Sequence, residues 1–296
     1  MPKVWLITGS SRGLGRELAR AVLDAGHRLV ATARKVDDLR DLAARYEGAV
    51  RPVALDVTDA AAARAAVAVA ASAFGRLDVV VNNAGYANVN SIEDMAEDDF
   101  RAQIETNFFG VVNVTRAALP MLRAQRDGHI IQVSSIGGRG ASPGLGAYQS
   151  AKWAVGGFSE ILAKEVGPLG IRVTVVEPGG MRTDWAGSSM RIDEIRSDYQ
   201  ATVGARSSHL RENADAMRGD PAKVAQAILR IASEKEPPVR LLLGSDAVFL
   251  AGANAVARAE EDAKWKALSL STDVDGLGDF ADTPIGRMLT PKKTAW

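Results

Sequence analysis

The chain begins with an apolar strand, a glycine-rich turn and an amphipathic helix in direct succession. The strand VWLIT runs into GSSRGLG, which ends at Gly15, and then into RELARAVLDAGH. Glycines in such a turn let the backbone approach a pyrophosphate, and the helix N-terminus offers free N–H groups and a positive dipole end. The spacing G-x-x-x-G-x-G differs from the common dinucleotide fingerprint, so the strand and the helix around it carry the prediction. We expect a dinucleotide site at this turn, with a purely structural loop as the alternative.

Short apolar strands continue to alternate with helical segments along the chain. This alternation predicts a parallel sheet that is covered on both faces. We therefore expect a Rossmann-like, doubly wound α/β fold with a mainly parallel seven-stranded sheet and helices on both faces. The expected strands are VWLIT, RLVATAR, VRPVALDVTD, RLDVVVNNAG, His129–Ser134, IRVTVVEPGG and VRLLLGSD.

Composition and capping residues predict several of the helices. The run from Ala60 to Phe74 is rich in alanine, the best helix former. An aspartate followed by a proline at Asp220-Pro221 starts another helix as its N-cap and first-turn residue. An apolar stripe at helical spacing runs from Phe100 to Arg123, and Asn107 interrupts it with a polar group.

The chain turns polar after the sixth expected strand. There Ile192, Ile195, Tyr199 and Val203 are spaced roughly as one helical face. Because this segment follows a strand end, where ligands bind in such sheets, we interpret it as a mobile cover over a pocket.

No linker-like stretch divides the chain. We expect one domain over residues 1–250, including the cover at about 185–217, and a C-terminal helical extension and tail over 251–296. In that extension, Asn254–Leu270 suggests a final amphipathic helix, and the tail from Ser271, rich in Asp, Gly and Pro, suggests a loop.

The composition excludes several kinds of site. The 36 basic and 36 acidic residues balance, so no global field points to nucleic acid or an anionic membrane. The chain has no cysteine, and its three histidines are scattered without ligand-like spacing, so we expect no metal site. It opens directly into a strand and has no uncharged run long enough to span a bilayer, so we expect a cytoplasmic protein without membrane association.

A serine, a tyrosine and a lysine stand where a carbonyl-reducing site needs them. Tyr148 and Lys152 are four residues apart in a run with helical spacing, so they share a helix face. Ser135 ends the preceding strand and can meet Tyr148 at one substrate oxygen. Reduction by hydride needs a proton donor and a second donor at that oxygen. An ammonium and a cationic nicotinamide would both lower the phenol pKa from about 10. The Y-x-x-x-K pair alone does not establish such a site, because the same pair also occurs on many solvent-exposed helices.

The end of the second strand bears on the choice of dinucleotide. An NAD site places Asp or Glu there for the ribose 2′-hydroxyl, whereas this chain has Ala33, Arg34 and Lys35. Arg12, inside the glycine turn, can approach the same place. Guanidinium groups bind phosphate bidentately, which favours NADP(H) over NAD(H). The alternative is that Arg34 only caps a solvated strand end.

Together these motifs resemble those of the short-chain dehydrogenase/reductase family, of the single-domain type. In order they are TGSSRGLG, Asp56 after the third strand, NNAG, Asn107, Ser135, YQSAK and PGGMRT. The resemblance covers about residues 3 to 250 and does not extend to the rest of the chain.

The resemblance implies a catalytic set of Asn107, Ser135, Tyr148 and Lys152. Tyr148 would donate or accept the proton, and Ser135 would orient the substrate oxygen. Lys152 would bind the nicotinamide ribose and depress the tyrosine pKa. Asn107 would hold a water in a proton relay, although an asparagine simply bonded to neighbouring backbone is the alternative.

The resemblance also implies the residues that hold the dinucleotide. Three glycines of the first turn would contact the pyrophosphate, Asp56 would meet adenine, and Asn83 would support the adenine-side strand end. Thr183 would touch the carboxamide end of the cofactor. The full expected set is Thr8, Gly9, Ser11, Arg12, Gly13, Leu14, Gly15, Arg34, Asp56, Val57, Asn83, Ala84, Gly85, Tyr148, Lys152, Pro178, Gly179, Met181 and Thr183.

The leading hypothesis is an NADP(H)-dependent oxidoreductase that interconverts a ketone or aldehyde and an alcohol, in the reducing direction. One alternative is a dinucleotide-binding sensor or scaffold without turnover, although none of the four catalytic residues is missing. Another is a nucleotide-sugar epimerase or dehydratase, which usually needs a larger substrate domain.

The substrate and the assembly are less strongly indicated. The expected pocket wall is mostly apolar or small, which favours a neutral, apolar small-molecule carbonyl or alcohol. Its residues are Gly137, Ser142, Leu145, Trp185, Met190 and Tyr199. The helices that hold Asn107 and Tyr148 carry more apolar residues than one sheet face needs, so we expect a homodimer or homotetramer through them.

Overall fold

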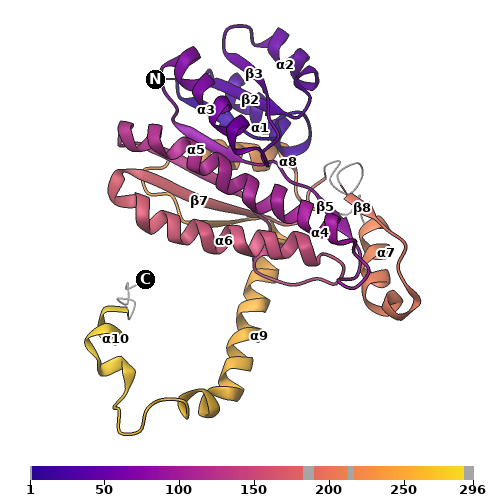
Figure 1. Ribbon diagram of the computed structural model, residues 1–296, viewed down its shortest axis with the longest axis vertical. Helices are drawn as coiled ribbons and strands as arrows, with labels where there is room; N and C mark the ends of the chain where they lie inside the picture. Colours follow the sequence, from indigo (N-terminus) through magenta and orange to yellow (C-terminus); the bar gives the residue numbers. More distant parts are fainter. Residues whose placement is uncertain (1, 183–189, 213–216, 290–296) are drawn as a thin grey trace. The chain divides into compact units, whose positions relative to one another are not determined.

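A computed structural model describes residues 2–182, 190–212 and 217–289. Seven parallel strands form one sheet in the order β3-β2-β1-β4-β6-β7-β9, which confirms the predicted sheet. Figure 1 labels β2, β3 and β7 of this sheet. The strands of this sheet are β1 (Val4–Ile7), β2 (Arg28–Ala33), β3 (Val50–Ala54), β4 (Val79–Asn82), β6 (Gly128–Val133), β7 (Ile171–Pro178) and β9 (Arg240–Leu243).

Helices cover both faces of the sheet because successive strand side chains point to opposite sides. In β1, Trp5 and Ile7 enter a core with α1, α2 and α8, whereas Val4 and Leu6 enter a second core with α3, α5 and α6. The predicted doubly wound arrangement is therefore correct. The helices are α1 (Gly13–Asp24), α2 (Arg40–Arg45), α3 (Ala60–Phe74), α4 (Glu97–Ile104), α5 (Gly110–Gln125), α6 (Gly146–Val166), α7 (Ala205–Glu212), α8 (Pro221–Ile231), α9 (Ser245–Leu270) and α10 (Pro284–Leu289).

Aspartate caps start two of the predicted helices. The Asp59 carboxylate accepts from two backbone N–H groups at the start of α3, and Asp220 does the same for α8. Gly75, with φ 77°, ends α3 in the left-handed conformation that glycine adopts without steric cost. The predicted span of α3 and the predicted Asp220 cap of α8 are therefore confirmed, whereas the Asp59 and Gly75 caps of α3 were not predicted.

The apolar stripe from Phe100 to Arg123 is not one regular helix. A π-helical turn, Glu105–Phe109, separates α4 from α5 and carries Asn107 at its middle. The extra residue of the wider turn shifts the helix phase, a change that a periodic pattern does not reveal.

A second, two-stranded parallel sheet was not expected from the sequence. It pairs β5 (Ala87–Val89) with β8 (Met190–Ile192). The prediction of one helical face from Ile192 to Val203 is thus wrong, because Ile192 lies in a strand. Tyr199 lies in a 3₁₀ turn and Val203 in a π turn before α7. Backbone pairing with β5 decides this conformation, so local periodicity could not predict it.

By its internal contacts the chain divides into Met1–Gly252 and Ala253–Trp296.

The final long helix, α9, begins at Ser245 rather than at the predicted Asn254. It continues through Gly252, because a glycine inside a helix costs only about 1 kcal/mol. Only one residue of α9, Ala247, is buried. The tail is not all loop either, because α10 forms after Thr283, whose Oγ1 accepts from Gly286 N at 2.9 Å.

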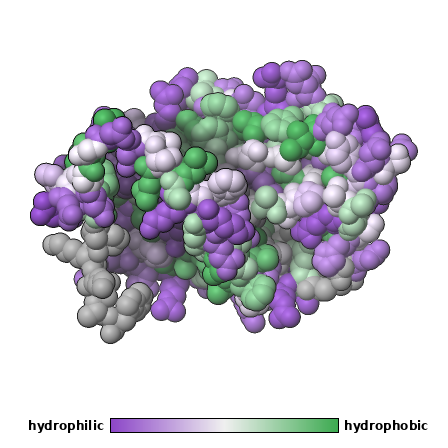
Figure 2. Space-filling model, turned by 90° about the horizontal axis from the view of Figure 1, so that it is seen from below, coloured by the Kyte–Doolittle hydropathy of each residue, from purple (hydrophilic) through white to green (hydrophobic). Residues whose placement is uncertain are grey.

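No helix within the described ranges is both long and apolar enough to span a bilayer. On the face shown in Figure 2, hydrophilic residues are interspersed among hydrophobic ones.

His129 is a buried, neutral histidine in β6. The Thr174 hydroxyl donates to Pro238 O at 2.8 Å, so it accepts from His129 Nε2, 2.9 Å away. The other ring nitrogen, Nδ1, is buried without a hydrogen-bond partner. Burial, with smaller contributions from Arg172 and Lys3, lowers the pKa of His129 to about 3.

We predict that His129 makes the fold less stable in mild acid. Between about pH 6.5 and pH 3 the unfolded imidazole binds a proton that the native one does not, so stability falls as pH is lowered. The free energy of unfolding should lose up to about 1.4 kcal/mol per pH unit from this group. Urea unfolding of His129→Gln between about pH 7 and pH 5 should show a correspondingly flatter dependence. An unchanged slope in His129→Gln would contradict the prediction.

Candidate active site

The glycine turn between β1 and α1 is held against the end of β4. Asn83 Nδ2 donates to Thr8 O at 2.9 Å and to Gly9 O at 3.1 Å. In return, Thr8 Oγ1 accepts from the backbone N–H groups of Asn83 and Ala84 at 2.9 and 3.0 Å. Asn83 thus supports the glycine turn itself. The sequence predicted a supporting role for Asn83 at a strand end but not its contact with this turn.

Two features of the turn require glycine. Gly9 and Gly13 have φ of 70° and 54°, in the left-handed region. A Cβ on Gly15 would lie 2.1 Å from the carbonyl oxygen of Gly9. This close packing leaves backbone N–H groups at the start of α1 for an anion, so the turn fits the pyrophosphate of a dinucleotide.

Three other predicted cofactor residues have side chains that are packed in the core or bonded locally, and their contact with a dinucleotide stays a prediction. The Leu14 side chain is buried in the core beneath α1, and the Val57 side chain packs on Gly110. Asp56 lies exposed after β3, and its Oδ1 accepts from Thr58 N and Oγ1 at 3.0 and 2.8 Å. Its other carboxylate oxygen remains for a ligand at this edge.

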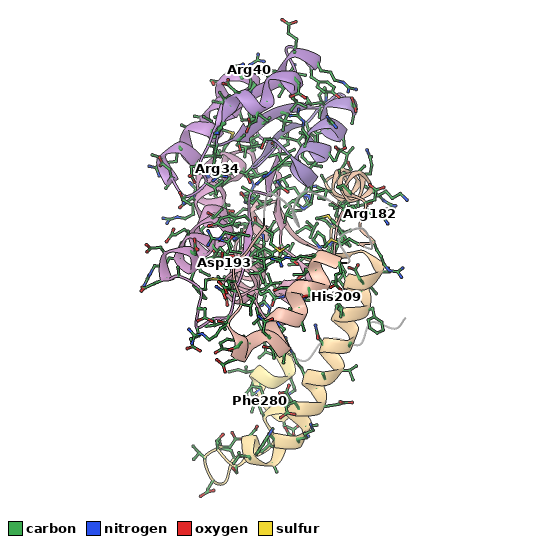
Figure 3. All side chains as sticks on the ribbon, turned by 90° about the vertical axis from the view of Figure 1, so that its right-hand side faces the viewer. Arg34, Arg40, Arg182, Asp193, His209 and Phe280 are labelled. Atoms are coloured by element: carbon green, nitrogen blue, oxygen red, sulfur yellow. The ribbon has the colours of Figure 1, made fainter. Side chains whose placement is uncertain are left out.

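The end of β2 presents a cation. Ala33 is buried, and the exposed Arg34 follows it directly. Figure 3 labels Arg34 together with Arg40, which starts α2. Arg12, at the N-cap of α1, is also exposed.

The structure brings the predicted serine, tyrosine and lysine together. Ser135 follows β6 and is hydrogen-bonded to the hydroxyl of Tyr148 on α6. Lys152 Nζ lies over the Tyr148 ring, 5.6 Å from its centroid, and donates to Val133 O at 2.8 Å. Tyr148 and Lys152 are 8% and 4% exposed, so water is largely excluded from both groups.

Burial moves the pKa values of this pair in opposite directions. It raises the pKa of Tyr148 to about 12, against a smaller lowering by the Ser135 hydrogen bond. It lowers the pKa of Lys152 to about 8. Loss of water around the phenolate thus outweighs the Ser135 hydrogen bond in this structure. The lowering expected from Lys152 together with a bound cationic nicotinamide stays a prediction.

Asn107 is fully buried and bonded to neighbouring backbone. Its Nδ2 donates to Tyr86 O and Gln103 O, both at 2.9 Å, and its Oδ1 accepts from Tyr86 N at 3.2 Å. A Cβ on Gly85 would meet Asn107 Oδ1 at 2.5 Å and Lys152 Nζ at 3.6 Å. The π turn thus places Asn107 beside the lysine, while its role in a water relay stays a prediction.

Gln103 was missed in the sequence. It is fully buried, and its Oε1 accepts from Asn88 N at 2.9 Å in β5. The available signal was a second amide, four residues before Asn107, inside the apolar stripe.

An apolar cluster surrounds Tyr148. The β5–β8 sheet and α7 contribute most of its side chains, so the expected wall residues Leu145 and Met190 do lie here, with Tyr199 packed against them. Trp185 falls outside the described residues, and Ala87 and Val89 of β5 were missed. The buried members are Ala87, Val89, Leu145, Tyr148, Met190, Val203 and Leu210.

Two other expected wall residues are occupied by a neighbour on α6. Ser142 N donates to Gln149 Oε1 at 2.7 Å, and a Cβ on Gly137 would meet Gln149 Nε2 at 2.9 Å. The Gln149 amide therefore contacts both positions, and their predicted place in the pocket wall stays a prediction.

The turn after β7 is closed by an aspartate that the sequence did not single out. Asp246 Oδ2 accepts from Gly180 N at 2.8 Å. A Cβ on Gly179 would lie 2.2 Å from the same carboxylate, so only glycine fits there. Pro178 ends β7 and Met181 bridges to Gly219, whereas Thr183 lies outside the described residues.

Among the described residues, no three His, Asp or Glu side chains gather as a metal site.

Comparison with known proteins agrees with this arrangement. The family described as short chain dehydrogenase matches residues 3–192. The chain belongs to the short-chain dehydrogenase/reductase family. It is accordingly an NAD(P)-dependent oxidoreductase, with the fold and the polar strand ends described above.

Two of the relatives come from a fungus and a bacterium. "Oxidoreductase BOA17" of Botryotinia fuckeliana is 54% identical over 92% of this chain and 100% of that protein. A "3-ketodihydrosphingosine reductase" of Bacteroides thetaiotaomicron is 38% identical over 82% of this chain and 88% of that protein.

Two solved structures show the same fold. A short-chain dehydrogenase from Streptomyces avermitilis superposes with a TM-score of 0.86 at 37% identity, covering 93% of this chain and 100% of that one. An alcohol dehydrogenase from Thermococcus sibiricus, complexed with 5-hydroxy-NADP, gives 0.69 at 28% identity, covering 82% and 96%.

We predict that Gly15→Ala disrupts the dinucleotide site. The new Cβ must displace the Gly9 carbonyl, and overpacking of this kind costs about 1–3 kcal/mol. The Kd for NADPH should rise about tenfold or more, measured by fluorescence titration. Gly157→Ala, on α6 with no heavy atom near its added Cβ, is the matched control and should bind NADPH normally. Unaltered NADPH binding by Gly15→Ala would show that the turn is not the site.

Proposed function

We propose that this protein reduces a ketone or aldehyde to an alcohol with NADPH, with Tyr148 as the proton donor. The observation that carries the proposal is the buried Tyr148 hydroxyl, hydrogen-bonded to Ser135 and with Lys152 across its ring. Such a pair of hydroxyls can hold one carbonyl oxygen while charge develops on it.

The protonation states suit the proposed proton donation by Tyr148. With pKa values of about 12 and about 8, the phenol and the ammonium both carry their protons near neutral pH. Tyr148 can therefore donate its proton to the substrate oxygen without first having to take one up. Ser135 holds the substrate oxygen, and Lys152 supplies a positive charge beside the phenolate that donation leaves.

The bound nicotinamide supplies the hydride. Residues suited to hold the dinucleotide are the glycine turn at the pyrophosphate and Asp56 near adenine. Lys152 would bind its nicotinamide ribose, and Asn107 would hold a water of the proton relay.

NADP(H) is the proposed cofactor. The exposed Arg34 directly after β2, and Arg12 at the N-cap of α1, support binding of a 2′-phosphate. The Thermococcus sibiricus relative, whose title names 5-hydroxy-NADP, adds support.

An apolar substrate is proposed from the cluster around Tyr148. Its buried side chains are aliphatic apart from the tyrosine itself, so they favour an apolar carbonyl compound. The relative named as a 3-ketodihydrosphingosine reductase supports this class.

Assembly as a homodimer or homotetramer is also proposed. Phe109, Trp153 and Ile161 lie on the π turn and α6 with 43%, 42% and 61% of their surface exposed. Pairing of these helices with a second copy would cover them.

Cofactor choice is predicted to reverse in Arg34→Asp. Loss of a charged hydrogen bond to phosphate, worth about 1.5–3 kcal/mol, should raise the Kd for NADPH about 10- to 100-fold while NADH binding is unchanged or improved. Arg40→Asp, in the next helix, should leave the preference intact. Equal affinity of the unmodified protein for NADPH and NADH would refute the assignment.

Turnover is predicted to depend on the Tyr148 hydroxyl. Tyr148→Phe keeps the ring but removes the proton donor, so kcat for ketone reduction should fall by about 10²–10⁴ while the Kd for NADPH changes little. Tyr199→Phe is the control, because its hydroxyl donates to Glu93 at 2.6 Å instead. Steady-state kinetics across a panel of apolar ketones provide the measurement. Near-normal turnover by Tyr148→Phe would place the chemistry elsewhere.

A further inference from the structure

A fully buried carboxylate lies at the end of β7, outside the predicted catalytic and cofactor-binding sets. Glu177 is 0% exposed and immediately precedes Pro178. Arg139 Nε and a terminal nitrogen lie 2.7 and 2.6 Å from its Oε2. Arg240 Nε donates to Oε1 at 3.0 Å, and a terminal nitrogen of Arg240 bonds the same oxygen. Each carboxylate oxygen therefore receives two charge-assisted bonds.

The first arginine ties the carboxylate to the loop that carries Ser135. Arg139 closes the short 3₁₀ turn Ile136–Gly138, whose backbone is tightly bonded. Gly138 N donates to Ser135 O at 2.8 Å, and Arg139 N donates to Ile136 O at 2.9 Å. Because the turn is short and bonded at both positions, anchoring the Arg139 side chain restrains Ser135.

The second arginine ties the same carboxylate to the helix that carries Tyr148 and Lys152. Arg240, on β9, also donates to Glu160 Oε1 on α6 at 2.8 Å. A Cβ on Gly156 of that helix would lie 3.0 Å from an Arg240 nitrogen, so the glycine makes room for the guanidinium. Two arginines and two glutamates thus form a neutral network across β7, β9, α6 and the Ser135 loop.

Stability alone gives a weak account of this network. Burying the Glu177 carboxylate costs free energy that its attraction to the arginines repays only with good geometry, and an apolar residue often stabilises a buried position as well. Glu160, with 48% of its side chain exposed, adds little to stability through its ion pair. A bidentate network also adds geometric specificity. Its hydrogen bonds form only when the elements that carry the arginines and the glutamates have one particular relative position.

We infer that Glu177 is a positioning residue, which through Arg139 and Arg240 holds the Ser135 loop in register with the Tyr148 helix. This inference rests on the proposed function for its kinetic consequence, but not for its structural one.

The structural consequence is tested first, by amide hydrogen exchange of residues 134–140. Arg139→Met removes one side of the network and leaves Glu177 paired with Arg240, so the fold should persist. Exchange at Gly138 should become about tenfold faster or more, since the loop loses its anchor. Asp127→Asn is the matched control: it breaks the 2.6 Å pair between Arg172 and Asp127 at the opposite end of β7. This control should leave exchange at Gly138 unchanged, and unchanged exchange in Arg139→Met would overturn the inference.

The kinetic consequence is tested by coupling to Ser135. Arg139→Met should lower kcat about 10- to 100-fold, as misplacement of a catalytic group does, with the Kd for NADPH within about threefold of wild type. Arg139→Lys should restore part of the activity. In a Ser135→Ala background, Arg139→Met should have less than about a threefold further effect, because the group it positions is gone. Glu177→Gln should behave as Arg139→Met does, provided that its far-UV circular dichroism is native.

The outcomes separate the two proposals. If Tyr148→Phe stays active, the proposed function fails, and the exchange experiment still decides whether Glu177 positions the loop. If Tyr148→Phe is inactive but Arg139→Met costs the same kcat with and without Ser135, the inference fails alone.

Discussion

Parallel strand pairing brings the carboxyl ends of β1, β4, β6 and β7 to one edge of the sheet, where the chain leaves each strand through a turn. Backbone and side-chain polar groups in these turns lie outside the ladder of sheet hydrogen bonds, so they are available to bind side chains or a ligand. The glycine turn, Asn83, Ser135 and Gly179 all follow strands at this edge. The mutual bonds of Thr8 and Asn83 join the first two of these strand ends, which sets the position of the turn before any ligand binds.

Exclusion of water governs the chemistry of the Tyr148 site. The same burial that raises the phenol pKa lowers the ammonium pKa, because each charged or chargeable group loses hydration. Both groups remain protonated at neutral pH, as the proposed proton donation by Tyr148 requires. The surrounding apolar cluster, to which β5, β8 and α7 contribute, maintains this burial.

Buried polar side chains hold the site together. Asn107 and Gln103 connect α4 and the π turn to the segment after β4, and Glu177 connects the loops and helices around β7. Each of these groups is satisfied by hydrogen bonds, without which its burial would be destabilising. The predicted kinetic effect of Arg139, a residue outside the reacting group, follows from this arrangement.

Short-range patterns in the sequence were enough to determine the alternation of strands and helices, the cap at Asp220 and the glycine turn. They also placed Ser135, Tyr148 and Lys152 together, since a strand end and a helix face fix where such side chains point. The three-residue strands β5 and β8 left no such local signal, because their pairing joins segments a hundred residues apart. The pKa of Tyr148 and the partners of Glu177 likewise depend on burial and on contacts between distant elements. Only the tertiary structure decided them, because desolvation and long-range ion pairs exist only once the chain has folded.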